Sequence, residues 1–424
     1  MRTPSFSLTA LLLCGVASPV NAADWPQYRG PYGNGQSTEQ VQLKPWSADG
    51  LRRVWKAPAE TGFSSLAIAD GRAFTIVGRQ IDGVPREVCV ALDATTGEGL
   101  WATPFGVARY DGGGDSGERD NKGGDGPRST PAVSDGRVYV YGGAMNLVCL
   151  DAKTGKSIWA KDIIREFGGK NIKWQSAASP VVDGDLLFAG SGGAGQSLIA
   201  LNKKTGATIW KTEDDAITHA TPVVAVIQGV RQVVFRTQRG LVSADVRNGS
   251  ILWRHNLPFR TAAGASPVVA NDIVYCSSGY GVGAAAVKIS KQGSTFEAAP
   301  LWRKPNQLMN HWATPVVNDG FLYGLFGHAA YGRAPLVCVD LATGEEKWSQ
   351  GNFGLGGVIL VGDQLIVLAD DGELVLVKAT PDGYTEQGRF AAVDGKCWST
   401  PAFSDGKIFI RSTTEAACYD AAAK

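Results

Sequence analysis

The sequence predicts an all-β fold, an eight-bladed β-propeller whose N-terminal strand completes the last blade. Three observations support this prediction: a phrase of fixed spacing that returns along the chain, alternating apolar strands between turn signals, and a final repeat that lacks one strand. Self-similarity with a period of roughly 20–50 residues is typical of solenoids and propellers. Short alternating strands separated by turns are typical of all-β folds.

Residues 1–22 have the features of a secretory signal peptide. Arg2 gives a positive start, Leu8 to Val16 is a short apolar run, and Ala22 is a small residue at the expected cleavage site. We therefore expect an exported protein, either in the bacterial periplasm or associated with the outer membrane.

Lipidation at Cys14 is not expected. A lipoprotein signal places a small residue directly before the modified cysteine, and here that residue is Leu13. Peripheral association with the membrane stays open as an alternative to a freely diffusing protein.

Residues 23–50 are predicted to form an extended N-terminal segment outside the repeats. The stretch from Asp24 to Gly35 is rich in proline, glycine and aromatic residues, a composition that disfavours regular structure. We expect this segment to pack on the outside of the domain, with Trp25 and Tyr28 as anchors. The propeller itself is predicted to occupy residues 51–424.

The recurring phrase begins with Asp or Asn and ends eight residues later in tryptophan, with a glycine four residues before the tryptophan. The Asp or Asn side chain bonds to its own backbone and starts a tight turn, and the glycine supplies the positive φ that ends the turn. Five copies share this spacing: Asp93 to Trp101, Asp151 to Trp159, Asn202 to Trp210, Asp245 to Trp253, and Asp340 to Trp348.

Each unit opens with a small residue and proline, continues through an apolar strand and an alternating strand, and ends in the tryptophan-bearing fourth strand. The units are 64–101, 129–159, 178–210, 220–253, 265–302, 313–348, 356–390 and a truncated one from 399.

The eighth unit lacks its fourth strand, and an isolated strand from Arg52 to Lys56 carries Trp55. This tryptophan lies 46 residues before Trp101, whereas the other tryptophan steps run from 43 to 58 residues. The isolated strand is therefore in phase with the repeats and can close the ring, which protects the sheet edges.

We expect the tryptophans to dock each blade onto its neighbour rather than to carry chemistry. An indole buries about 150–250 Å² of surface, so such a contact stabilises a blade interface. The predicted docking residues are Trp55, Trp101, Trp159, Trp210, Trp253, Trp302 and Trp348, with Phe390 in the place of tryptophan in the seventh unit.

Charge and cysteine content exclude some classes of function. The 41 basic and 40 acidic residues nearly balance, so no bulk attraction to nucleic acid is expected. Cys149 and Cys338 occupy the same place in two repeats, where they are too far apart to form a disulfide. We interpret the cysteines after the leader as small buried hydrophobic residues.

The phrase Asp-x-x-Thr-Gly-x-x-x-Trp, as in Asp151 to Trp159, resembles the tryptophan-docking motif of the pyrroloquinoline quinone (PQQ) repeat propellers. The resemblance covers residues 51–424. That superfamily contains quinoprotein alcohol dehydrogenases and a non-catalytic branch, similar to the outer-membrane assembly factor BamB, whose members are binding scaffolds in the cell envelope. The resemblance to this branch implies a non-catalytic, monomeric scaffold that binds an envelope protein.

The dehydrogenases hold PQQ between a tryptophan and a disulfide of adjacent cysteines, beside a calcium ion. This chain has no adjacent cysteines, and no motif matches the calcium ligands or the catalytic aspartate. We therefore expect no cofactor, no metal and no catalytic residue. A PQQ-dependent alcohol or sugar dehydrogenase stays as the alternative, and a carbohydrate-binding propeller as a second one.

Binding residues of a propeller are expected on the loops around the central channel, because the blades supply a rigid ring. Residues just before each inner strand should face this mouth. Aromatic rings with an arginine and histidines can stack on and pair with a planar, anionic or sugar-like ligand; alternatively, they plug the channel and support the loops. The candidates are Phe63, Arg128, Trp174, His219, His311, Trp312 and Trp398.

The longest polar insertion runs from Asp111 to Asp125 and contains five acidic residues among glycines. Calcium prefers such oxygen ligands, but the spacing does not fit an EF-hand loop. We interpret the insertion as a solvated loop at the rim of the ring. His219 and His311 have no third ligand at a recognisable spacing, so no zinc site is predicted.

Overall fold

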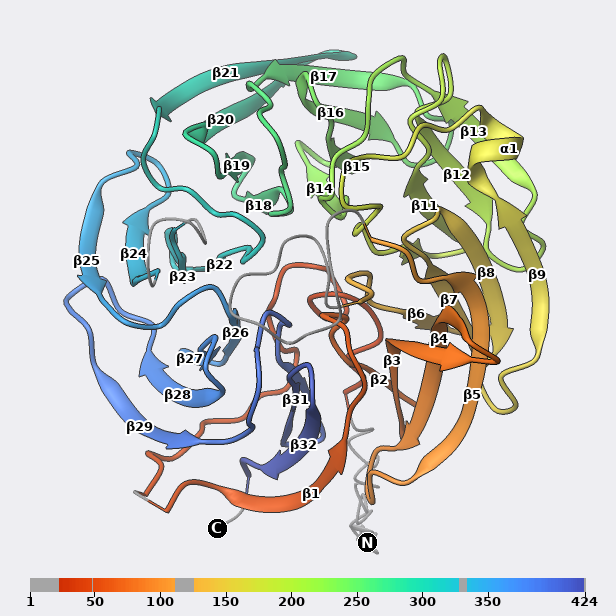
Figure 1. The fold of residues 1–424 in the computed structure, drawn as a ribbon. Coiled ribbons are helices and arrows are strands. Elements are labelled where there is room, and N and C mark those ends of the chain that lie inside the picture. The colour runs from red at the N-terminus through yellow and green to blue at the C-terminus, as the bar shows by residue number, and fades with distance from the viewer. Residues whose placement is uncertain (1–22, 48, 111–125, 328–333, 423–424) are drawn as a thin grey trace, which may run out of the picture.

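The chain forms a closed ring of eight four-stranded antiparallel sheets, seen end-on in Figure 1. The computed structural model describes residues 23–47, 49–110, 126–327 and 334–422. The expected signal peptide, Cys14 and the 111–125 insertion lie outside these residues. The predicted eight-bladed propeller is confirmed.

Each blade contributes four strands in order from the channel outwards. The first blade consists of β2 (Ala67–Ala69), β3 (Arg72–Ile81), β4 (Val84–Asp93) and β5 (Gly99–Val107), and the second of β6 (Ala132–Ser134), β7 (Arg137–Tyr141), β8 (Asn146–Asp151) and β9 (Ser157–Asp162). The third blade consists of β10 (Val181–Asp183), β11 (Leu186–Gly190), β12 (Leu198–Asn202) and β13 (Thr208–Thr212), and the fourth of β14 (Val223–Ile227), β15 (Val230–Arg236), β16 (Gly240–Asp245) and β17 (Ile251–Asn256).

The last four blades follow the same pattern. The fifth blade consists of β18 (Val268–Ala270), β19 (Ile273–Ser278), β20 (Gly283–Gln292) and β21 (Thr295–Lys304), and the sixth of β22 (Val316–Asn318), β23 (Phe321–Leu325), β24 (Leu336–Asp340) and β25 (Glu346–Gln350). The seventh blade consists of β26 (Gly357–Val361), β27 (Gln364–Leu368), β28 (Glu373–Lys378) and β29 (Glu386–Ala391), and the eighth of β30 (Ala402–Ser404), β31 (Lys407–Arg411), β32 (Glu415–Asp420) and β1 (Arg52–Pro58). A short helix, α1 (Ile163–Phe167), follows the second blade.

Both ends of the chain contribute to the eighth blade. β1 pairs antiparallel with β32, so that Arg52 lies opposite Asp420 and Pro58 lies opposite Glu415. Two ion pairs, Arg52–Asp420 and Lys56–Glu415, link the same two strands. This pairing is the ring closure that the incomplete last repeat predicts.

The joint between two blades combines a hydrogen bond with a close ring contact. Nε1 of Trp101 donates to the carbonyl oxygen of Ala152, in the turn of the next blade, at 3.1 Å. Gly155 lies against the same indole, and a Cβ there would be 2.6 Å from the ring. Glycine is thus required both by its φ of 71° and by this contact. The indole-to-carbonyl bond recurs at Trp55, Trp159, Trp210, Trp302 and Trp348.

Two joints depart from this geometry. The β20–β21 hairpin of blade five is longer, and Nε1 of Trp253 donates at 2.8 Å to Oε1 of Gln232 in its own blade. The expected bond to the next blade is therefore not made, although Trp253 is buried against blade five. The side chain of Phe390 has no N–H to donate. Its ring packs against Gly50, where an added Cβ would lie 2.4 Å from the ring. Gly50 lies two residues before β1, so the N-terminal region completes this joint.

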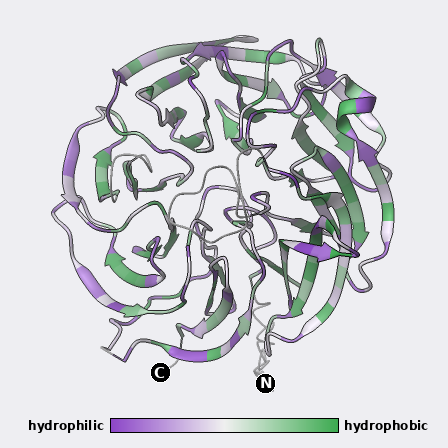
Figure 2. Cartoon of the chain, in the orientation of Figure 1, coloured by the Kyte–Doolittle hydropathy of each residue, from purple (hydrophilic) through white to green (hydrophobic). Residues whose placement is uncertain are grey.

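The cores lie between neighbouring blades, where the strands are mostly hydrophobic, whereas hydrophilic segments lie on the outer strands (Figure 2). The six cysteines in the described part of the chain are buried and free, as expected for small hydrophobic residues. Among the described residues, no helix is long and apolar enough to cross a bilayer.

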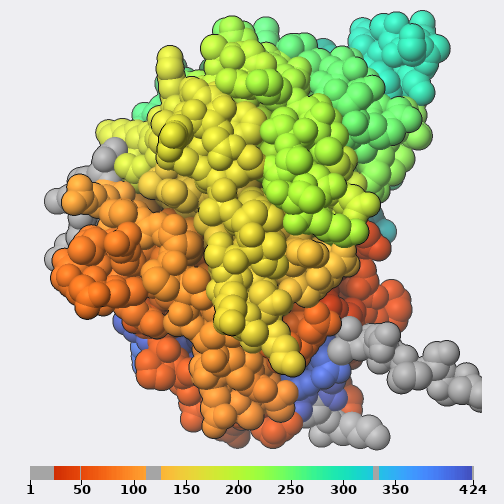
Figure 3. All heavy atoms as spheres, turned by 90° about the vertical axis from the view of Figure 1, so that its right-hand side faces the viewer, coloured from red at the N-terminus to blue at the C-terminus, as the bar shows by residue number. Residues whose placement is uncertain are grey.

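Two hairpins extend beyond the others. The β3–β4 hairpin joins a second strand to a third, and the β20–β21 hairpin joins a third strand to a fourth, so they point to opposite ends of the ring. In the side view of Figure 3, the turquoise β20–β21 hairpin projects at the upper right and orange residues of the first blade lie on the left. The two ends of the ring therefore present different surfaces.

Candidate functional site in the central channel

The space enclosed by the eight inner strands is filled in three layers. Because equivalent residues of the repeats lie at the same level, the residues before each inner strand form the mouth. Two positions further along, serine and threonine hydroxyls form a belt. The strands themselves contact the N-terminal segment, which fills the end of the channel opposite the mouth.

Four of the predicted mouth residues form a continuous series of ring contacts. Phe63 stacks on Trp398 with 4.9 Å between ring centroids, and Trp398 lies 4.2 Å from Trp312. His311 continues the series, with 4.3 Å between its ring and that of Trp312. Loops of the first, sixth and eighth blades therefore meet over the channel.

The series extends to two more predicted residues through Tyr280, in the β19–β20 loop. The ring of Tyr280 lies 5.0 Å from that of His311 and 6.5 Å from that of Trp174, to which it is nearly parallel. Trp174 in turn lies 6.4 Å from His219. Seven rings from six blades are thus linked at one end of the ring.

His219 is the most buried titratable group in this series, with 8% of its surface exposed. Its Nε2 lies 2.8 Å from the carbonyl oxygen of Lys173, which can only accept, so Nε2 carries the proton. Burial, with a smaller effect from the charge of Arg128, lowers the pKa of His219 to about 4, although the hydrogen bond to Lys173 acts in the opposite direction. At neutral pH the mouth therefore contains a neutral imidazole, whose Nδ1 has no hydrogen-bond partner among the described residues.

Two lysines lie against the rings, and Arg128 lies beside them. Lys396 Nζ is 4.8 Å from the ring centroid of Trp398, and Lys173 Nζ is 4.7 Å from that of Trp174. Arg128 donates from Nη1 to the Trp174 carbonyl oxygen at 3.1 Å. Such cation–π contacts hold the indole faces in place and give the mouth local positive charge.

Glu87, in β4, places a buried carboxyl group beside Arg128. Its carboxylate accepts from the hydroxyl of Tyr110 at 2.5 Å and from the backbone N–H of Gly143 at 3.0 Å. Burial raises the pKa of Glu87, whereas these two hydrogen bonds and the charge of Arg128 lower it. Glu87 therefore links the first blade to a loop of the second at the edge of the mouth.

The belt of hydroxyls below the mouth joins neighbouring blades. The N–H of Thr400 donates to Oγ of Ser65, and the N–H of Ser65 donates to Oγ1 of Thr130, at 2.9 and 3.0 Å. Three more bonds of this kind follow, each at 2.9 Å: the N–H of Thr130 donates to Oγ of Ser179, that of Ser179 to Oγ1 of Thr221, and that of Ser266 to Oγ1 of Thr314. In the first, second, third, fourth and sixth blades, the small residue that opens the repeat therefore has a structural role, because its hydroxyl accepts a backbone N–H from the preceding blade.

The N-terminal segment fills the channel below this belt, which corrects the expectation that it packs on the outside. Trp25 is 1% exposed and pairs through its backbone with Ile68 of the inner strand β2. The carbonyl of Pro26 accepts from the N–H of Val133. The proline and glycine content correctly disfavours regular structure, but it carries no information on where the segment packs.

Arg29 fixes the segment across the channel. Its guanidinium donates to the carbonyl oxygens of Thr314 at 2.6 Å and Pro315 at 2.7 Å, at the start of the sixth blade. It also donates to Asn34 O at 2.9 Å, within the segment itself. Burial lowers the pKa of Arg29 to about 10, so the side chain is still protonated at neutral pH.

The structure thus brings Phe63, Trp174, His219, His311, Trp312 and Trp398 into one series, with Arg128 bonded to Trp174. Their role in ligand binding stays a prediction. Tyr280, Lys396 and Glu87 were missed, because each lies away from the positions that directly precede an inner strand. No repeat signal marks them; the fold alone places them at the mouth.

No group of three or more histidine, cysteine or acidic side chains in the described ranges is arranged to hold a metal ion, and calcium requires several oxygen ligands. Trp312 and Trp398 are in mutual contact, so a flat ring system cannot enter between them without moving one indole.

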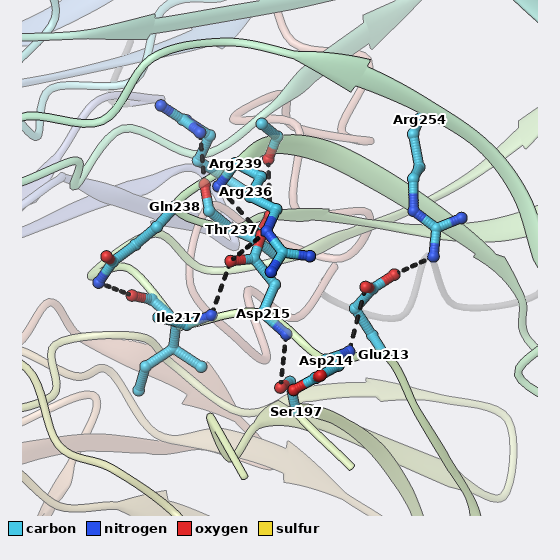
Figure 4. A network of polar contacts seen from close by, with 12 residues as sticks. Ser197, Glu213, Asp214, Asp215, Ile217, Arg236, Thr237, Gln238, Arg239 and Arg254 are labelled. Atoms are coloured by element: carbon cyan, nitrogen blue, oxygen red, sulfur yellow. Dashed lines mark hydrogen bonds and ion pairs between the residues drawn. The ribbon is translucent and has the colours of Figure 1, made fainter. Parts of the chain in front are cut away.

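A second polar cluster lies on the mouth end between the third and fifth blades (Figure 4). Asp215 accepts from the backbone N–H of Arg239 at 3.0 Å, and Glu213 pairs with Arg254. Both carboxylates are nearly buried, whereas 71% of the Arg239 side chain and 53% of the Arg254 side chain are exposed. The β15–β16 loop and strand β17 therefore present two arginines to solvent.

Comparison with known proteins relates this architecture to two groups of propellers. The outer membrane protein assembly factor BamB of Moranella endobia is 27% identical over 271 residues, which cover 60% of this chain and 65% of that protein. This chain therefore spans less than two thirds of the length of that relative.

Two solved structures share the fold. The crystal structure of BamB from Moraxella catarrhalis has a TM-score of 0.59 at 15% identity, over 87% of this chain and 97% of that one. A quinohemoprotein alcohol dehydrogenase from Pseudomonas putida has a TM-score of 0.61 at 13% identity, over 95% and 81%. The fold therefore does not separate scaffold from dehydrogenase. The family of the outer membrane protein assembly factor BamB matches residues 85–324, more than half of the sequence, and the protein belongs to this family.

Proposed function

We propose that the protein is a non-catalytic scaffold of the bacterial cell envelope that binds a protein taking part in outer-membrane assembly. Membership of the BamB family carries this proposal. Two features of the ring support it: mutually packed aromatic rings cover one end of the channel, and the N-terminal segment fills the other. Binding surfaces are then expected on the outer loops, which a rigid ring holds in place.

We propose the arginines of the polar cluster, Arg239 and Arg254, as part of the docking surface. Glu213 bonds to the Arg254 side chain, and Asp215 bonds to the Arg239 backbone and lies 3.8 Å from its Nε, so the two buried carboxylates reduce the side-chain entropy that is lost when a partner binds. Arginine is enriched at protein interfaces and pairs with carboxylates in two-pronged geometry. An acidic patch on the partner fits this surface.

The test is affinity capture of the mature protein from envelope extracts of its own organism, followed by mass spectrometry. We expect an outer-membrane assembly protein to be enriched, and enrichment to fall at least tenfold in the double variant Arg239→Glu, Arg254→Glu. The matched control is Lys153→Glu, Lys156→Glu, two exposed cations in a blade-joint turn. Recovery of no such protein, or equal loss in both variants, contradicts the proposal.

A carbohydrate-binding role is a second candidate, favoured by the series of aromatic rings at the mouth. Trp174, Trp312 and Trp398 are half-buried and keep part of each indole exposed. Sugar rings stack on such faces. A glycan array discriminates this role: binding should disappear in the double variant Trp312→Ala, Trp398→Ala, and unchanged binding would discard the mouth as the site.

We further propose that the protein acts without a quinone. Adding PQQ and calcium to the purified protein should produce neither quinone absorbance on the protein nor dye reduction with alcohols or sugars. A stoichiometric quinone spectrum would instead support the dehydrogenase alternative.

A further inference from the structure

One open pocket lies where the N-terminal segment leaves the channel wall uncovered. It is shallow and open to solvent, with a cavity volume of about 30 Å³. Tyr28 and Tyr32 of the N-terminal segment line one side, and the inner strands β10 and β14 line the other, with Ser266 of the fifth blade. The pocket therefore lies on the opposite end of the ring from the aromatic mouth.

At other blades, backbone groups of the N-terminal segment form hydrogen bonds with the N–H and carbonyl groups of the inner strands. Leu360 of the seventh blade donates to Gly35 O and accepts from the N–H of Ser37, both at 2.8 Å. Ile68 of the first blade exchanges the same two bonds with Trp25, at 2.9 and 2.8 Å. The exposed edge of an inner strand in this protein is thus a site for an extended peptide chain.

The fourth blade offers the same edge without an occupant from the described part of the segment. Val224 lies opposite Val233 in the β14–β15 pair, and Ile68 lies opposite Ala73 at the equivalent place in the β2–β3 pair. The N–H and carbonyl of Val224 therefore point into the channel, as those of Ile68 do. No described residue of the N-terminal segment bonds to β14, and Val224 is half-buried, whereas Ile68 is fully covered.

The hydroxyl belt is interrupted at the same place. Thr130, Ser179, Thr221 and Thr314 each accept a backbone N–H from the preceding blade, but Oγ of Ser266 has no partner among the described residues. Ser266 is 3% exposed and lines the pocket. A buried hydroxyl without a hydrogen bond costs free energy, so a ligand that reaches it gains affinity.

We propose that a short extended peptide segment of a partner protein adds to the free edge of β14 beside this pocket. A peptide backbone supplies the acceptor and the donor that Val224 requires, in the way that Gly35 and Ser37 serve Leu360. Val223 and Pro222 in the wall suit small apolar side chains, and the exposed Tyr32 and the Arg231–Asp183 ion pair border the opening. The site is separate from the proposed arginine docking surface.

The probe is a phage-displayed random heptapeptide library, selected on the immobilised full-length mature protein. Selected peptides, synthesised with a fluorophore, should bind the wild type and protect the amide of Val224 from hydrogen exchange. Val224→Pro removes the N–H that faces the channel and should weaken binding at least tenfold, since proline is tolerated at a strand edge whose N–H is unpaired in the sheet.

Val226→Pro is the matched control, because Val226 shares the same strand edge but lies outside the pocket. Its binding should stay within twofold of wild type. N-methylation of the central peptide bond tests the same pairing with the protein unchanged, and it should also weaken binding tenfold.

Three outcomes would overturn the proposal: no peptide is selected, so the pocket holds solvent only; Val224→Pro and Val226→Pro bind alike; or the protected amides lie in the mouth loops. Capture of an outer-membrane assembly protein should be unaffected by Val224→Pro. Failure of the peptide site and failure of the proposed function are therefore distinguished.

Discussion

At the scale of single residues, the turn glycine of the repeat has two roles that the sequence shows only in part. The spacing of the phrase predicts that glycine supplies a positive φ at the end of the turn. The structure adds that the indole of the preceding blade occupies the space of its missing Cβ. The turn aspartates act only within their own turns, because the side chain of each accepts hydrogen bonds from backbone N–H groups of the same turn, as at Asp93, Asp151 and Asp340.

The contribution of the ring contact can be separated from that of the positive φ. Gly155→Ala should cost about 1–2 kcal/mol for its left-handed conformation and about 1–3 kcal/mol for overlap with Trp101. Gly136→Ala is the control, because Gly136 has a φ of 68° and nothing within 4 Å of the added Cβ. Urea unfolding of both variants measures the difference. Equal destabilisation would show that the indole contact imposes no requirement for glycine.

His219 should make stability depend on pH over a defined range. Its pKa is about 4 in the folded protein and about 6.5 when unfolded, so between these values the unfolded chain binds more protons. The free energy of unfolding should therefore fall as pH drops from 6.5 to 4, by on the order of 3 kcal/mol, and show no His219 contribution above 6.5.

The measurement for His219 is urea unfolding at pH 7, 5.5 and 4, compared with His219→Gln. The variant keeps an N–H that can donate to Lys173 O but does not titrate. Its stability should lack this part of the acid dependence, and an identical pH profile for both proteins would assign the acid sensitivity to other groups.

At the scale of elements, the N-terminal segment is the part that sequence reasoning placed wrongly. The strands, their order and the closure by β1 follow from periodicity, turn residues and the incomplete last repeat, all of which are local signals. The position of residues 24–46 depends instead on contacts between distant segments, such as Arg29 with Thr314. No local pattern contains that information. The same limit applies to Tyr280, which joins the mouth only through the fold.

The segment should stabilise the ring chiefly through Arg29. Arg29→Met removes the donors of two buried carbonyls, those of Thr314 and Pro315, and each unsatisfied carbonyl costs about 1–3 kcal/mol. Lys44→Met, at an exposed position of the same segment, is the control. Thermal and urea unfolding should show a loss of roughly 2–5 kcal/mol in Arg29→Met alone. A loss no larger than that of Lys44→Met would mean that solvent replaces the guanidinium.

At the scale of the whole molecule, the ring has two separate closures. The β1–β32 pairing completes the eighth sheet, whereas the segment before it ties the inner strands together from within the channel. Arg411 adds to the first closure, since its guanidinium reaches from β31 to Thr75 and Ile76 of the first blade at 2.9 and 3.2 Å. These closures act on different parts of the ring, so they should fail in different ways.

Two truncated proteins separate these closures. A chain that begins at Pro45 keeps Trp46, Gly50, β1 and the Phe390 joint but lacks the channel segment. It should remain folded and monomeric with a lower melting temperature.

A chain that begins at Glu60 also lacks β1, which leaves β32 as an unpaired edge and removes the Trp55 joint. Unpaired edge strands associate with other chains, so this protein should form oligomers or aggregates. Size-exclusion chromatography with light scattering distinguishes the two, and a monomeric, equally stable chain from Glu60 would show that β1 is not needed to protect the ring.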